Sequence, residues 1–260
     1  MIEAAGKYRV GCVPYLNAKP LVQWLDENAE DNGAYLTYDV PSKLADRLNS
    51  ADLDVALVSI FEVFQNPTLH IIPDISISAD GAVRSVRLFS KVPVAQIKSV
   101  ALDASSLTSV ALTKIILAEK YSLFPTYIAS PPNLSKMLQD YDAGLIIGDL
   151  SLFNSPVAEI LDLGSEWKEL TGLPFCYAAW LARPGTDLKH LTKLLAESKQ
   201  WGLNHLRELT AKWSIEMGLD MNRVHEYFYD IMKFDLDEHK LAAIAKFEEL
   251  CHKYQLITNN

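Results

Sequence analysis

The sequence predicts an α/β protein of two lobes. Through residues 1–185, short apolar strand-like segments alternate with helix-like ones, which is typical of mostly parallel sheets. In addition, SKLADRLNSADLDVALVSIFEVF (42–64) is similar to NLSKMLQDYDAGLIIGDLSLF (133–153). Each reads as a helix, an acidic turn, an apolar strand and a short helix; the match needs small gaps, so chance is a competing explanation. Two lobes with the same order of helices and strands would hold a ligand between the carboxyl ends of their sheets.

The individual elements follow from periodicity and turn residues. We expect strands at 10–13, 35–40, 54–58, 86–92, 100–102, 126–129 and 175–181. We expect helices at 20–28, 42–49, just after Ser59, and 103–117, with amphipathic helix from 187 onward as a C-terminal tail.

Composition excludes several classes of function. The net charge is −9, and no Lys/Arg-rich block exists, so nucleic acid is not an expected partner. No run approaches the roughly 18 apolar residues of a membrane span, and the N-terminus lacks the apolar core of a secretory signal. The three cysteines are far apart, and neither CxxC nor HExxH occurs. We therefore expect a cytoplasmic protein with no metal, no cofactor and no membrane partner; its oligomeric state stays open.

The stretch VGCVPYLNAKPLVQWL (10–25) carries more polar chemistry than a strand-to-helix turn requires. Its loop follows a strand's carboxyl end and would face the ligand. Asn17 can donate and accept hydrogen bonds, and Tyr15 can stack on a flat molecule. Alternatively, Asn17 only caps the helix and Tyr15 packs on the surface.

A second candidate is GAVRSVRLFS (81–90), a glycine turn followed by an alternating strand. Alternation places Ser85, Arg87 and Phe89 on one face. The alternative is that the strand, with its two arginines, is simply half solvated.

A third candidate is DASSLTS (103–109), which crowds hydroxyls at a helix N-terminus, where free amides and the helix dipole attract anions. Ser105, Ser106 and Thr108 would seat a carboxylate. Ordinary capping needs only one such residue.

LGSEWKELTGLPFCYAAW (163–180) shows little helical or strand periodicity before Phe175. We expect Thr171, Gly172 and Pro174 to form a loop that leads into the strand 175–181. Glu166 and Trp167 either serve the pocket or pack. No Ser–His–Asp order, P-loop or GxGxxG is present. The residues alone therefore indicate a site for a small, anionic, flat ligand.

Six segments together resemble a known family. VGCVPYLNAKPL, DVALVSIFE, GAVRSVRLFS, LDASSLTSVALTKIIL, LIIGDLSL and DLGSEWKELTGLPFCYAAW, in order over residues 8–185, resemble the chorismate dehydratase family of menaquinone biosynthesis, which opens the futalosine route. The resemblance implies a periplasmic-binding-protein-like (type II) fold whose two lobes close over chorismate. It also implies lobes of 1–92 plus 182–260 and of 93–181, with a hinge near 89–92 and 179–183.

The resemblance also implies a reaction: chorismate loses water to give 3-[(1-carboxyvinyl)oxy]benzoate. It implies Asn17 and Ser85 as catalytic residues near the departing hydroxyl. The implied substrate-binding residues are Tyr15, Ser59, Arg87, Ser105, Ser106, Thr108, Gly148, Asp149, Thr171 and Gly172. We hypothesise that the substrate's own enolpyruvyl carboxylate removes the proton. Asp149 and Glu62 are alternative bases, each of which could instead be a cap or a surface charge.

Two other functions compete with this one. A sister lyase of the same pathway, 1,4-dihydroxy-6-naphthoate synthase, resembles the family in fold, but the YLN-x-x-P-L form of the first loop favours the dehydratase. A non-catalytic binding protein for a small carboxylate would be expected to carry a secretory signal or lipobox, which the sequence does not show.

Overall fold

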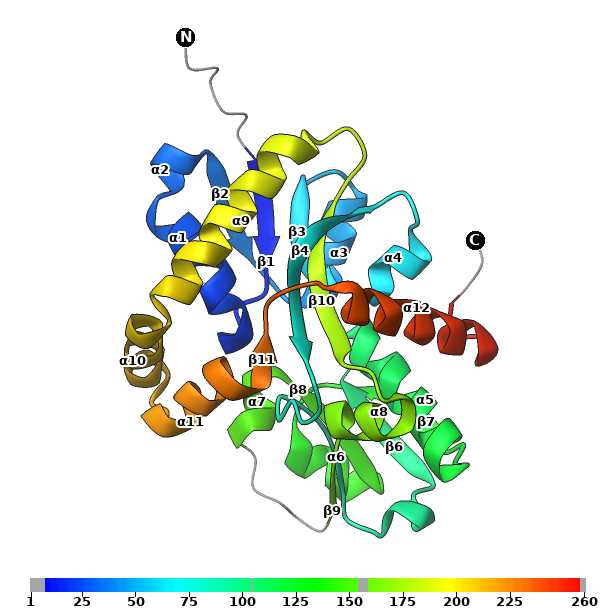
Figure 1. The fold of residues 1–260 in the computed structure, drawn as a ribbon. Coiled ribbons are helices and arrows are strands. Elements are labelled where there is room, and N and C mark those ends of the chain that lie inside the picture. Colours follow the sequence, from blue (N-terminus) through cyan, green and yellow to red (C-terminus); the bar gives the residue numbers. More distant parts are fainter. Residues whose placement is uncertain (1–7, 104, 154–158, 258–260) are drawn as a thin grey trace. The chain divides into compact units, whose positions relative to one another are not determined.

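The protein forms two compact α/β units in the computed structural model, which describes residues 8–103, 105–153 and 159–257 (Figure 1). Unit 1 comprises residues 1–77 and 178–237, and unit 2 comprises residues 78–177 and 238–260. Each unit has its own mixed sheet with helices against it. The predicted α/β class is therefore confirmed.

The first sheet has the strand order β11-β4-β10-β3-β1-β2. Its strands are β1 (Tyr8–Cys12), β2 (Ala34–Tyr38), β3 (Val55–Ser59), β4 (His70–Ala79), β10 (Phe175–Ala182) and β11 (Met232–Lys233). β1 is parallel to both neighbours, with Val10 opposite Leu36 and Val55. β3 is buried along its whole length, as its sequence VALVS predicts for a central strand.

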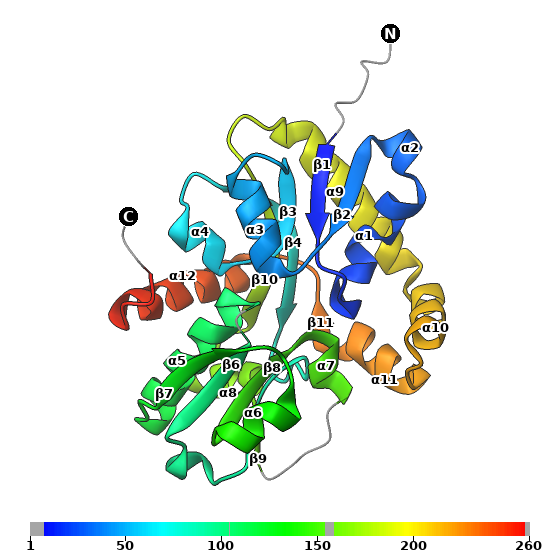
Figure 2. The ribbon, with the colours of Figure 1, turned by 180° about the vertical axis from the view of Figure 1, so that it is seen from behind.

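Helices cover both faces of this sheet. They are η1 (Leu16–Ala18), α1 (Lys19–Glu27), α2 (Ala29–Asn32), α3 (Pro41–Asn49), α4 (Phe61–Gln65), α9 (Leu188–Asn204), α10 (Leu206–Met217), α11 (Met221–Glu226) and η3 (Tyr227–Ile231). α9 crosses one face, and α3 lies on the other, as Figures 1 and 2 show. α1 and α9 approach so closely that a Cβ on Gly202 would lie 1.7 Å from the Pro20 carbonyl oxygen. Only glycine fits at this contact.

The second sheet, in unit 2, has the order β7-β6-β8-β5-β9. Its strands are β5 (Val86–Ser90), β6 (Ser99–Asp103), β7 (Thr126–Ser130), β8 (Ala143–Ile147) and β9 (Glu159–Asp162). β6 is parallel to β7 and β8, whereas β5 is antiparallel to β8 and β9. Its core includes Phe89, Ala101, Met137 and Ile146.

The helices of unit 2 include one that the sequence did not predict. They are η2 (Val94–Gln96), α5 (Leu107–Tyr121), α6 (Leu134–Asp140), α7 (Gly148–Phe153), α8 (Leu163–Thr171) and α12 (Glu238–Lys253). The sequence showed little periodicity before Phe175, but residues 163–171 form α8. The predicted loop is reduced to residues 172–174, between α8 and β10. Asp162 caps the helix, and Gly172, with φ of 73°, ends it.

The helix–strand–helix similarity in the sequence is confirmed. Unit 1 contains α3, β3 and α4 in succession, and unit 2 contains α6, β8 and α7. The two segments therefore occupy equivalent places in their sheets, each with a buried strand at its centre.

The compact units differ from the expected lobes in three stretches: residues 78–92 and 238–260 belong to unit 2, and residues 178–181 belong to unit 1. β5 lies within 1–92 but pairs with β8 and β9 in the second sheet. α12 lies in the tail but packs in unit 2, where Phe247 contacts the rings of Trp167 and Phe175 with centroid distances of 6.0 and 5.0 Å. The hinge positions stay a prediction.

Candidate functional site

The carboxyl ends of three parallel strands meet at one edge of the first sheet. The loop that carries Tyr15 and Asn17 follows β1, and Ser59 ends β3, the neighbour of β1. Ser59 is buried, and Tyr15 is half-buried. Unit 1 thus gathers three of the predicted site residues at the edge where α/β sheets bind ligands.

Asn17 lies in η1, and its side chain does not cap a helix. The N-cap of α1 is Ala18 and that of η1 is Tyr15, and neither helix has a side-chain cap. The capping alternative for Asn17 is therefore wrong. Its Oδ1 atom is buried and has no hydrogen-bond partner among the residues that the structure describes. A buried amide oxygen without a partner costs free energy, which a ligand donor would remove.

Lys19, two residues further along, places a positive charge at the same edge. The side chain is buried, and its Nζ lies 4.1 Å from the ring centroid of Trp213 and 5.1 Å from that of Tyr38. Ring faces attract a cation. Burial raises the pKa of Tyr38, so its ring stays neutral. Lys19 was part of the quoted stretch but not among the predicted site residues.

Glu62, in α4, is a buried carboxyl group. It is 5% exposed, and burial, followed by repulsion from Asp46, raises its pKa to about 7. A surface-charge interpretation of Glu62 is therefore wrong. At neutral pH the group is partly protonated, which suits a proton donor as well as an acceptor.

In unit 2, strand register brings several predicted residues to one sheet edge. Val86, at the start of β5, pairs with Ile147, at the end of β8, so Ser85 and Gly148 extend from adjacent strand ends. Gly148, with φ of 62°, opens α7, which also carries Asp149. β6, parallel to β8, ends at the same edge and leads toward Ser105.

Two residues of the hydroxyl cluster after β6 (Ser105, Ser106 and Thr108) make hydrogen bonds within their own segment. Ser106 caps α5 by accepting a hydrogen bond from the Ser109 amide, and Ser105 donates from N and Oγ to Asp103 Oδ1 at 3.0 and 2.7 Å. Thr108 is buried. Burial raises the pKa of Asp103, although the Ser105 bonds act in the opposite direction. Capping therefore accounts for Ser106, and the cluster as a whole surrounds the helix N-terminus.

Arg87 points to the same side of β5 as Phe89, as strand alternation predicts: its guanidinium lies 5.0 Å from the Phe89 ring centroid. Its Nε donates to Ser151 Oγ at 3.2 Å. Its Nη2 is buried and has no hydrogen-bond partner in the described part of the chain. Burial lowers the pKa of Arg87. A half-solvated strand does not explain this arginine, whereas a bound anion would.

Asp162 is a residue that sequence reasoning missed. Its carboxylate accepts from the amides of Val83 and Arg84 at 2.9 and 2.7 Å and also caps α8. A Cβ on Gly164 would lie 2.2 Å from the Gly81 carbonyl oxygen, so the turn before Ser85 rests directly on α8. The sequence signal was an aspartate two residues before a glycine, at a strand end.

Two predicted residues lie elsewhere. Thr171 and Gly172 are at the C-terminal end of α8, whereas the sheet edge is at its N-terminal end. The structure therefore does not bring them together with Ser85 or Ser105. Glu166 and Trp167 pack: Glu166 pairs with Lys120 at 2.6 Å, and Trp167 is fully buried.

The fold defines the class of protein. Similar solved structures include a protein from Archaeoglobus fulgidus, with 16% identity, coverage of 96% of this chain and 98% of that one, and a TM-score of 0.78. They also include the periplasmic aliphatic sulphonate binding protein of Escherichia coli, with 14% identity, 98% and 95% coverage, and a TM-score of 0.67. This is an α/β protein with a periplasmic-binding-protein-like fold, as expected.

The chain belongs to the menaquinone biosynthesis family, whose model matches residues 8–253. One relative, a chorismate dehydratase of Thermus thermophilus, is 30% identical over 93% of this chain and 94% of its own length. Another relative, a chorismate dehydratase of Campylobacter jejuni, is 27% identical over 95% of this chain and 98% of its own length. The family resemblance stated from six segments is confirmed. Within the described ranges, none of the helices has the length and apolar character needed to cross a membrane.

Proposed function

We propose that this protein is a chorismate dehydratase that acts in the futalosine route to menaquinone. The family and the names of two full-length relatives support this function. The observation that carries it to particular residues is the buried Oδ1 of Asn17, a polar atom at a sheet edge that has no partner among the residues the structure describes.

The reaction removes one proton and one hydroxide from neighbouring ring carbons of chorismate. The proton leaves the carbon that bears the enolpyruvyl ether, the hydroxyl leaves the next carbon, and the two form water. The ring becomes aromatic, which drives the reaction. The proton is acidic because the diene delocalises the negative charge onto the ring carboxylate, so donors around that carboxylate stabilise the intermediate.

We assign Asn17 and Ser85 to the departing hydroxyl and to holding the reactive geometry. The Asn17 Nδ2 and the Ser85 hydroxyl are the groups that can donate to the leaving oxygen, because the Asn17 Oδ1 only accepts. Neither is a base at neutral pH, so the substrate's enolpyruvyl carboxylate accepts the proton. Arg87 suits one substrate carboxylate, because its buried Nη2 has no partner within the described part of the chain and its cation is held against Phe89. The hydroxyls of Ser105 and Thr108 near the start of α5 suit the binding of an anion.

Glu62 is a second candidate acid or base. It is buried in unit 1 shortly after Ser59, and its pKa lies near neutrality, unlike that of an ordinary carboxyl group. We keep it as an alternative to the substrate carboxylate. A Glu62→Gln variant that retains turnover assigns the proton transfer to the substrate.

The test is to incubate the purified protein with chorismate, without added metal or nucleotide, and to follow products by liquid chromatography and mass spectrometry. Loss of one water to give the enolpyruvyl benzoate is the expected result. Unchanged chorismate from folded protein would reject the proposal. Thermal-shift measurements with chorismate and with the substrate of the sister lyase would then separate that lyase from a non-catalytic binder.

A further inference from the structure

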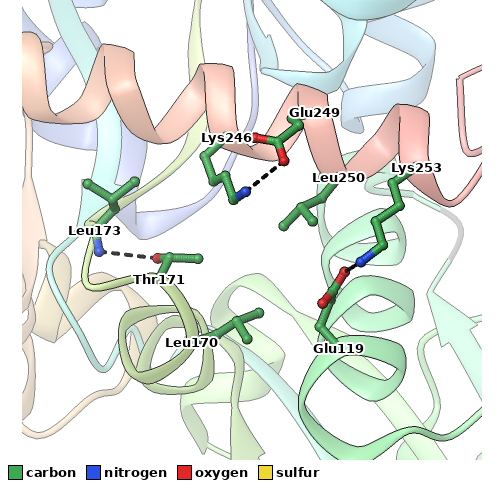
Figure 3. A pocket seen from close by; sticks show the side chains of 8 residues that line it. All are labelled: Glu119, Leu170, Thr171, Leu173, Lys246, Glu249, Leu250 and Lys253. Carbon is green, nitrogen blue, oxygen red and sulfur yellow. Dashed lines mark hydrogen bonds and ion pairs between the residues drawn. The ribbon is translucent and has the colours of Figure 1, made fainter.

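A cavity of about 410 Å³ lies in unit 2 between α5, α8 and α12 (Figure 3). Its lining residues come from these three helices and from the loop after α8: Glu119, Leu170, Thr171, Leu173, Lys246, Glu249, Leu250 and Lys253. All eight belong to one compact unit, so the cavity is a property of unit 2 alone.

This cavity is separate from the sheet edge where Ser85 and Ser105 lie. α5 begins beside the edge and ends at Tyr121; its 15 residues span roughly 20 Å at about 1.5 Å per residue. α8 also begins beside the edge and ends at Thr171. The cavity lies at the far ends of both helices, and the proposed dehydration does not use it.

One part of the cavity is apolar. Leu170 and Leu173 are half-buried, and Leu250 of α12 is 5% exposed. In Figure 3, Leu170 and Leu250 extend into the space between the helices. A hydrocarbon group placed against these three side chains would lose contact with water, which favours binding.

The other part carries balanced charges. Lys246 Nζ pairs with Glu249 Oε1 at 2.8 Å, and Lys253 pairs with Glu119. The side chains of Lys246 and Glu249 are 39% and 64% exposed, so their mutual pairing contributes little to stability and can open for a ligand. Two ammonium groups and two carboxylates leave no net charge among the lining side chains.

The end of α8 adds a place for a cation. The Gly172 amide donates to the Lys168 carbonyl oxygen at 2.8 Å, and the carbonyl groups of the last turn carry the partial negative charge of a helix C-terminus. Lys246, from the α12 side, offers an ammonium group to an anion. A molecule with one charge of each sign and an apolar body matches this arrangement, whereas a molecule of single charge leaves one lining charge without a partner.

We propose that this cavity binds a zwitterionic α-amino acid with an apolar side chain, its carboxylate at Lys246, its ammonium group toward Glu249 and the end of α8, and its side chain against Leu170, Leu173 and Leu250. Bound there, the ligand holds α12 against α8. The inference does not depend on the dehydratase activity, because its test uses no chorismate.

Isothermal titration of the full chain with L-phenylalanine tests this proposal. We expect saturable binding, at least tenfold weaker for 3-phenylpropanoate, which lacks the amine, and for 2-phenylethylamine, which lacks the carboxylate. Lys246→Met and Leu170→Lys should each weaken L-phenylalanine binding at least tenfold. Lys193→Met, which removes another exposed lysine paired on its own helix, should leave it unchanged.

Three results would overturn the proposal. The first is a titration with no saturable heat up to about 10 mM L-phenylalanine. The second is that 3-phenylpropanoate and 2-phenylethylamine bind as tightly as L-phenylalanine. The third is that Lys246→Met and Leu170→Lys both bind L-phenylalanine as tightly as the wild type does. Circular dichroism of each variant shows that it is folded before titration. Because the two variants alter different walls, an unfolded Leu170→Lys still leaves Lys246→Met as a decisive measurement.

Discussion

Asp162 accepts a hydrogen bond from the backbone amide of Arg84 at 2.7 Å, although the two residues are 78 positions apart. The same carboxylate caps α8 and bonds to the Val83 amide. Arg84 has a positive φ of 59°, so its backbone depends on such outside support. Asp162 thereby fixes the turn from which Ser85 extends.

We expect Asp162→Ala to lower dehydratase turnover by more than its effect on stability explains. Loss of a cap typically costs about 1 kcal/mol, but here the Ser85 turn also loses two of its hydrogen bonds. Asn133→Ala is a matched control, because Asn133 caps α6 in the same unit by accepting from Lys136. Turnover on chorismate and thermal unfolding are measured for both; equal turnover losses in the two variants contradict a positioning role.

The proposed roles of Asn17 and Ser85 predict a particular kinetic pattern. Asn17→Ala and Ser85→Ala should depress kcat by about 100-fold or more, as removal of a transition-state hydrogen bond does, with little change in the affinity for chorismate. Arg87→Gln should instead raise KM, because this residue is assigned to a carboxylate. Steady-state kinetics and equilibrium binding separate the two effects; near-normal kcat in both alanine variants rejects the assignment.

The Asp54 carboxylate should be important for the stability of unit 1. Arg9 donates to it from N, Nε and Nη2, and Arg183 donates from Nε and Nη2 at 3.1 and 2.8 Å, so the carboxylate ties β1 to the end of β10. Burial alone would raise the pKa of Asp54, but these donors lower it well below its ordinary value. We expect Asp54→Asn to destabilise the protein by about 2 kcal/mol, the order of a charged hydrogen bond.

This stabilisation has a defined pH dependence. Since the folded-state pKa is depressed, the contribution is present above the ordinary carboxyl pKa and is lost as pH falls toward the folded value. Urea unfolding at neutral and acidic pH should therefore show the gap between wild type and Asp54→Asn narrowing in acid. Glu197→Gln, which breaks an exposed pair with Lys193, serves as the control and should change little at either pH. A gap that does not narrow would contradict the prediction.

The contribution of Glu62 to stability should depend on pH in the opposite direction. Its folded-state pKa of about 7 exceeds the ordinary value of 4.5, so the protonated form stabilises the fold below pH 4.5, and that contribution is lost as pH rises through 7. Relative to Glu62→Gln, the wild type should lose about 3 kcal/mol across this range, at about 1.4 kcal/mol per pKa unit. Chemical denaturation of both proteins at pH 4.5 and 8 measures the change; a constant difference would show that Glu62 is not shifted.

Local patterns predicted most of the strands and the residues at the two sheet edges. Helices and strands that depend on contacts between distant parts of the chain were missed. β4 contains Pro73 and a positive φ at Asp74, which interrupt its alternation. α8 was missed although Leu163, Trp167 and Leu170 recur at helical spacing; its Trp167 is buried by Phe175 and by Phe247, 80 positions away in α12. Packing of this kind depends on the folded chain, so no window of sequence contains it.

The proposed site residues differ in how local their signal in the sequence is. Asn17 and Ser85 stood out because polar residues next to strand ends have a local signature, and Arg87 stood out because of the alternation within its strand. Asp162 did not, because its importance comes from two amides near residue 84. Thr171 and Gly172 were assigned from the family resemblance, but α8 separates them from the sheet edge.

The chain enters unit 2 at residue 78, returns to unit 1 at 178, and ends in unit 2 from 238 onward. β3 has its partner β1 close by in the sequence, but its other neighbour, β10, is synthesised more than 100 residues later. During translation, β3 therefore lacks its β10 neighbour until the residues of unit 2 between them have been synthesised. The pairing of β3 with β10 is a contact of long sequence separation, and such contacts slow folding. Neither unit is completed on its own: unit 1 needs a strand made after the body of unit 2, and unit 2 needs a helix made after unit 1.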